Sequence, residues 1–108
     1  MTAGIDGMFM ATDFSTTRMN KDFLLAHRRA YPKGVKEKIL AFMKKCPPFA
    51  YSSGNIVDCV TGKKTNVPGT LCKDPKGIWY WASHHVYYLE FYDLALDEAF
   101  IRYVMERS

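Results

Sequence analysis

The sequence lacks the short motifs by which zinc sites and redox centres are usually recognised. Its three cysteines, Cys46, Cys59 and Cys72, stand thirteen residues apart, and no C-x-x-C or C-x-x-H pair occurs. This spacing excludes the common zinc and thioredoxin-type motifs. Because three thiols cannot all pair with one another, we expect them to be reduced. No metal, cofactor or catalytic residue is predicted, and the protein is not expected to be an enzyme.

Membrane-length hydrophobic runs and a recognisable signal peptide are also missing. A membrane-spanning helix needs about 20 apolar residues in succession, so no contact with a membrane is predicted. The segment Thr61-Gly62-Lys63-Lys64-Thr65 contains part of a phosphate-binding loop, but it lacks the preceding glycine and opens no predicted helix. We interpret it as a hairpin turn. Together with reduced cysteines, these absences favour a bacterial cytoplasmic protein.

What is present is the composition of one globular domain. The chain has 108 residues, of which 48% are hydrophobic and 15% aromatic, enough to build a core without disulfides or metal. Residues 1–20 hold several Gly, Thr, Ser and Met residues and show no sustained hydrophobic period. We therefore expect a poorly ordered leader over residues 1–20 and a single α+β domain over residues 21–108.

Helical patterns stand at both ends of this domain. Asn20 can cap a helix over residues 21–30, and an apolar stripe beginning at Val35 predicts a second helix that Pro47 and Pro48 end. Two further helices are predicted near the C-terminus by the same signals. Ser83 can cap a helix over residues 84–92, and Asp97 can cap the last one.

Strand patterns occupy the middle of the chain. Residues 49–52 and 55–61 suit two strands separated by a Ser53-Gly54 turn, residues 67–73 read as irregular, and residues 78–82 form a strand after a strong turn. The predicted architecture is therefore two N-terminal helices, a small antiparallel sheet and two C-terminal helices.

Charge is distributed unevenly, with a formal net charge of +4. The basic part, residues 21–45, could bind nucleic acid through Arg28, Arg29, Lys36, Lys44 and Lys45. The chain beyond Ser83 is acidic, which would favour a basic protein partner. A third interpretation is that both stretches are simply solvated helix faces.

Aromatic residues cluster between Trp79 and Tyr92. Such a cluster can stack nucleic-acid bases, anchor a protein interface or fill a small core. We expect the core to take several of them and a protein partner to contact the others. The candidate partner-binding residues are Trp79, Trp81, Tyr87, Tyr88, Tyr92, Glu90 and Asp93.

His84 and His85 are the remaining candidates for chemistry. Adjacent histidines on a helix point about 100° apart, so both rarely bind one metal ion. A small nuclease or hydrolase using either histidine is the least supported of the functional hypotheses.

The C-terminal third carries a faint resemblance. A turn at Asp74 is followed by W-x-W, an aromatic pair, Y-x-L and F-x-x-x-V, which places the pattern at Trp79, Trp81, Tyr87, Tyr88, Tyr92, Leu94, Phe100 and Val104. This resembles small uncharacterised bacterial domains of the accessory genome, some of which are toxin-neutralising immunity proteins. The resemblance implies a non-catalytic protein that binds and occludes a protein partner, whose identity stays open, as does the oligomeric state.

Overall fold

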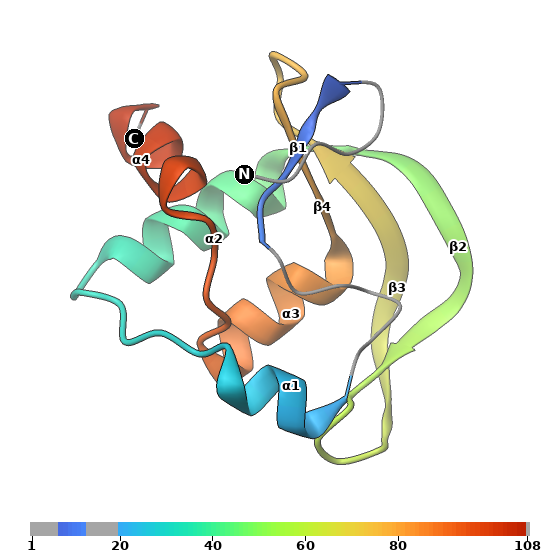
Figure 1. Ribbon diagram of the computed structural model, residues 1–108. Helices are drawn as coiled ribbons and strands as arrows, with labels where there is room; N and C mark the ends of the chain where they lie inside the picture. The colour runs from blue at the N-terminus through green and yellow to red at the C-terminus, as the bar shows by residue number, and fades with distance from the viewer. Residues whose placement is uncertain (1–6, 13–19, 108) are drawn as a thin grey trace.

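A mixed α+β fold is seen in the computed structural model, which describes residues 7–12 and 20–107 (Figure 1). The α+β class predicted from the sequence is therefore confirmed. None of the helices in these ranges is long and apolar enough to cross a membrane. The elements in chain order are β1 (Phe9–Met10), α1 (Lys21–Ala26), α2 (Val35–Lys45), β2 (Pro48–Val57), β3 (Lys64–Lys73), β4 (Trp79–Ala82), α3 (Ser83–Tyr92) and α4 (Glu98–Arg107).

The sheet differs from the small antiparallel sheet that was predicted. Its strand order is β1-β4-β3-β2, in which β3 is antiparallel to both neighbours but β1 runs parallel to β4. A strand thus precedes the two N-terminal helices, and the sheet is mixed. A strand of two residues has no period by which the sequence could reveal it.

Part of the expected leader belongs to this fold. The Ala11 amide donates to the Tyr80 carbonyl at 3.0 Å, and the Asp97 amide donates to the Ala11 carbonyl at 2.8 Å. Ala11 and Thr12 are buried, with 0% and 2% of their surface exposed. The segment Gly7–Thr12 therefore joins β4 to the loop before α4. Residues 1–6 and 13–19 lie outside the described residues.

Strands β2 and β3 form a long hairpin that curves around α3 (Figure 1). The predicted turn at Ser53-Gly54 is instead an irregular stretch inside one ten-residue strand, with register shifts on both sides of it. The predicted irregular segment is most of β3. Because β4 pairs only with Leu71–Lys73 of β3, the rest of the hairpin continues as a two-stranded extension. We call the paired strands β2 and β3 the ribbon.

The helices bury their apolar stripes in a core rich in aromatic rings. Helix α2 follows its prediction closely and buries Ile39, Phe42 and Met43. The Phe42 and Phe100 rings lie 6.2 Å and 5.6 Å from the Trp81 ring, in tilted arrangements. The predicted cap of the last helix is confirmed, since Asp97 accepts the Ala99 amide at 2.8 Å. The three cysteines are free, as expected.

Ion pairs join the basic and acidic parts of the chain. Lys36 of α2 pairs with Asp93 at 2.6 Å, and Lys44 pairs with Glu90 of α3 at 3.0 Å. Arg29 pairs with Glu98 in the same way. Exposed pairs of this kind stabilise a fold by about 0–1 kcal/mol each. Their larger consequence is that Glu90, Asp93 and Glu98 are neutralised within the molecule.

Candidate functional site

Three of the predicted partner-binding aromatics lie in the core. Trp79, Trp81 and Tyr88 expose 3%, 0% and 0% of their surface. All four residues of β4 are buried, because this strand lies between β1 and β3 and is covered on both faces. A partner that docks on this conformation would not touch these three side chains. The predicted residues that reach the surface are Tyr87, Glu90, Tyr92 and Asp93.

Tyr87 and Tyr92 are hydrogen-bonded to the buried carboxylate of Asp58. Both hydroxyls donate to Asp58 at 2.6 Å, and Asp58 also accepts the amides of Val60 and Thr61 at 2.7 Å and 3.0 Å. Burial alone would raise the pKa of Asp58, but these four hydrogen bonds outweigh it and hold the pKa below its usual range. The hydrogen bond to Asp58, followed by burial, raises the pKa of Tyr87 to about 12. The cluster fastens the turn between β2 and β3 to α3.

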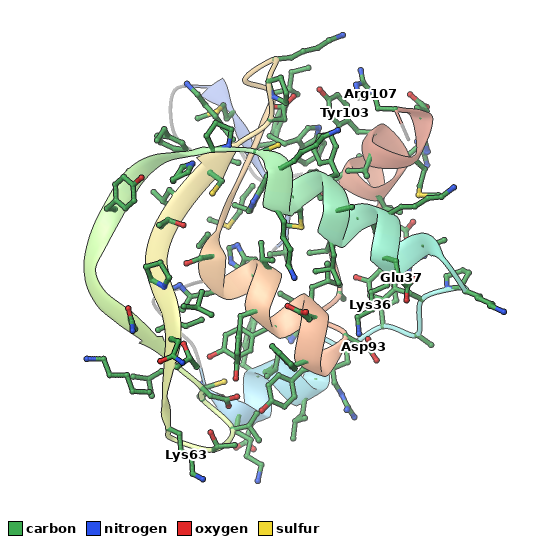
Figure 2. All side chains as sticks on the ribbon, turned by 180° about the vertical axis from the view of Figure 1, so that it is seen from behind. Lys36, Glu37, Lys63, Asp93, Tyr103 and Arg107 are labelled. Carbon is green, nitrogen blue, oxygen red and sulfur yellow. The ribbon has the colours of Figure 1, made fainter. Side chains whose placement is uncertain are left out.

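Asp74 plays the same part at the turn between β3 and β4. It is 1% exposed and accepts the amides of Ile78 and Trp79 at 2.6 Å and 2.8 Å, together with the Tyr103 hydroxyl from α4. Figure 2 shows Tyr103 beside Arg107, whose guanidinium carbon lies 3.5 Å from the centroid of the Tyr103 ring. Burial opposes ionisation of Asp74, yet its hydrogen bonds keep the pKa below the usual range. Both aspartates are structural anchors.

The histidines do not form a reactive pair. His85 is fully buried, and its Nδ1 accepts the Ala82 amide at 3.0 Å, which caps the start of α3. Helix α3 therefore begins one residue earlier than predicted, with His85 in the capping role assigned to Ser83. His84 is half-buried, and burial lowers its pKa. Within residues 7–12 and 20–107, no three His, Cys, Asp or Glu side chains are placed to hold a metal ion.

A groove of about 430 Å³ lies between the ribbon and helices α2 and α3. Its interior is mostly apolar, and the Ser83 hydroxyl in its wall already has hydrogen-bond partners. The Ser83 hydroxyl donates to the Pro68 carbonyl at 2.9 Å and accepts the Thr70 amide at 3.0 Å. The lining residues come from four elements and the turn after α2; they are Met43, Lys44, Cys46, Pro48, Tyr51, Val67, Pro68, Thr70, Cys72, Ser83, Val86, Tyr87, Glu90 and Phe91.

Two exposed aromatic side chains border this groove. Tyr51 of β2 exposes 75% of its surface and Phe91 of α3 exposes 62%. The exposed Lys44–Glu90 ion pair also belongs to its lining. Of the predicted set, the structure therefore brings Tyr87 and Glu90 to the groove. Phe91 stood in the aromatic block without being selected, and nothing in the local sequence of Tyr51 distinguishes it.

No family model matches the chain, and neither the curated proteins nor the solved structures contain a match to it. The resemblance of the C-terminal third to immunity proteins therefore stays an expectation. The groove described above is therefore selected as the candidate binding site from its geometry alone.

The thiols that line the groove are poor nucleophiles. Cys46 and Cys72 expose 5% and 9% of their surface, and burial raises the pKa of each thiol. The Cys46 thiol also donates to the Phe42 carbonyl at 3.3 Å. At neutral pH both thiols are protonated, whereas the thiolate is the form that attacks electrophiles and binds metals. The groove therefore offers an apolar surface that suits binding.

Proposed function

We propose that this protein binds a protein partner and receives one of the partner's apolar side chains in the groove. The observation that carries the proposal is the groove itself: a cavity of about 430 Å³ with mostly apolar walls and exposed Tyr51 and Phe91 at its border. Cavities of roughly 300–1,000 Å³ are typical of ligand-binding pockets, so this groove has ample room for one side chain. Aromatic residues at such positions commonly supply most of an interface's binding energy.

The unpaired charge at the surface favours an acidic partner. The C-terminal acids that suggested a basic partner, Glu90, Asp93 and Glu98, are each paired with a cation. Several exposed lysines form no ion pair with any described residue, so the surface keeps most of the net positive charge. Complementary charge speeds association and selects the partner. These lysines are Lys38, Lys45, Lys63, Lys64, Lys73 and Lys76.

A protein that covers a partner's surface needs no catalytic residue, so binding alone can be its function. An inhibitory or toxin-neutralising role would follow if the groove engages an active or substrate-binding surface. The ion pairs weigh against the nucleic-acid alternative. Three of its five proposed cations, Arg29, Lys36 and Lys44, are already neutralised by carboxylates.

Selection from a displayed library of random twelve-residue peptides tests the proposal. We expect the selected peptides to combine an aromatic or aliphatic residue with acidic residues. Their affinity should fall at least tenfold for Phe91→Ala and Val86→Arg, because both residues line the groove. Leu25→Ser is the matched control, since Leu25 is an exposed hydrophobe on α1 outside the groove.

Two results would overturn the proposal. One is a set of selected peptides that binds the groove variants as tightly as the unmodified protein. The other is the absence of selected peptides together with tight binding of a fluorescent single-stranded oligonucleotide that weakens steeply with salt, because that dependence reports released counterions.

A further inference from the structure

Strand β2 is an unusual edge strand. It stands last in the order β1-β4-β3-β2 and pairs only with β3 among the described strands. Its ten residues, PFAYSSGNIV, include no charged side chain, and Phe49, Tyr51 and Val57 are exposed. Proteins usually protect a long edge strand with charged residues, bulges or a covering element, because its amides and carbonyls can pair with another chain. Strand β2 has register shifts around Gly54 but no charged residue. The opposite edge, β1, is only two residues long.

Lysines stand on both sides of this uncharged strand. Lys44 and Lys45 precede it at the end of α2, and Lys63 and Lys64 follow it around the turn to β3. Figure 2 shows Lys63 at the end of the ribbon, well apart from the site where Lys36 meets Asp93. Lys44 is paired with Glu90, which leaves three of the four lysines without an ion pair in the described chain.

These lysines argue against a second copy of the chain on β2. An antiparallel pairing of two β2 strands would bring Lys44 and Lys45 of one copy near Lys63 and Lys64 of the other. A parallel pairing would place each lysine pair beside the same lysine pair of the other copy. Like charges opposite one another destabilise strand pairing. A strand from another protein that carries acidic residues at both ends would instead place these carboxylates beside the lysines.

We propose that an acidic, extended segment of the partner adds to the free edge of β2 as a fifth strand and directs its anchoring side chain into the groove. The inference rests on the proposed function and specifies that the partner binds as an extended strand. Tyr51 connects the two sites, because it belongs both to the edge strand and to the lining of the groove. Strand addition obtains affinity from main-chain hydrogen bonds and specificity from pockets beside the edge.

The test uses selected peptides that carry N-methyl groups at single backbone positions. Strand addition requires alternate peptide amides to donate to β2, so methylation at alternate positions should weaken binding at least tenfold, while the intervening positions tolerate it. Hydrogen exchange should slow at β2 amides when the peptide binds. The double variant Lys63→Glu/Lys64→Glu should lower affinity, whereas Lys33→Glu, in the loop before α2, should not.

The outcomes separate this inference from the proposed function. If methylation has no alternating effect and β2 exchange is unchanged, strand addition is refuted. Loss of binding in Phe91→Ala and Val86→Arg would in that case still support the groove. If the groove variants bind normally while β2 is protected, the edge is the binding site and the groove proposal fails.

Discussion

The cluster around Asp58 permits a quantitative prediction. Replacing Asp58 by Asn keeps the side-chain shape but exchanges one carboxylate oxygen for an amide group that cannot accept a hydrogen bond. The Tyr87 and Tyr92 hydroxyls, both 2.6 Å from one carboxylate oxygen, would lose their acceptor. The oxygen that accepts the Val60 and Thr61 amides would be retained.

The size of the effect follows from these contacts. A hydrogen bond to a charged group contributes about 1.5–3 kcal/mol. Because Tyr87 and Tyr92 are only partly buried, their hydroxyls can bind water after the substitution and recover some of this energy. We therefore expect the free energy of unfolding to fall by about 2–3 kcal/mol in total. For a urea dependence of about 1–3 kcal/mol per M, the unfolding midpoint should fall by roughly 0.7–3 M.

Urea unfolding followed by tryptophan fluorescence measures this change, since Trp79 and Trp81 are both buried. Asp22→Asn is the control, because Asp22 is exposed on α1, and it should stay within about 0.5 kcal/mol of the unmodified protein. A midpoint for Asp58→Asn equal to that of the control would refute the proposed role of the carboxylate.

The lowered pKa of Asp58 predicts how the stability lost in Asp58→Asn changes with pH. The folded-state pKa of Asp58 lies below its ordinary value, so its contribution to stability is fully present above the unfolded pKa of about 3.9. The contribution is lost as pH falls through the lower folded pKa. The stability difference between the unmodified protein and Asp58→Asn should therefore be constant near neutral pH and shrink in acid. A difference that grows in acid would contradict the assignment.

Three further outcomes follow from the structure. His85→Ala should lower the free energy of unfolding by at least about 2 kcal/mol, because the cap of the Ala82 amide is lost and the fully buried ring leaves a cavity. Chemical denaturation measures the change, and an unchanged stability would contradict the capping role. Glu90→Gln should change stability by less than about 1 kcal/mol, as its ion pair with Lys44 is exposed; a larger loss in thermal unfolding would indicate a stronger pair. With an aromatic disulfide reagent, Cys59 should react before Cys46 and Cys72, whose burial raises their pKa; equal rates would contradict the buried placement.

The fold was predictable where a local signal determined it. The stripe from Val35 and the cap at Asp97 predicted helices that the structure contains. The Ser53-Gly54 pair misled because turn residues also occur within bulged strands, where Gly54 adopts a positive φ of 81°. Strand β1 could not be predicted, since its pairing depends on a partner some 70 residues away.

The candidate site was less predictable because it depends on tertiary contacts. Trp79 and Trp81 are core residues because the Phe42 and Phe100 rings of helices α2 and α4 pack against them. The role of Asp58 could not be predicted from the sequence, because it depends on hydrogen bonds from Tyr87 and Tyr92, which are distant in the chain. Local composition identified an aromatic-rich region, but it could not say which rings face solvent.

The short parallel strand β1 also bears on the order in which the protein can be completed. Residues 7–12 are synthesised well before their hydrogen-bond partners Ile78, Tyr80, Ala95 and Asp97. The growing chain must therefore keep this segment unpaired through most of translation. Contacts of such long separation slow folding. Pairing of β1 with β4 is therefore expected to be a late step of folding.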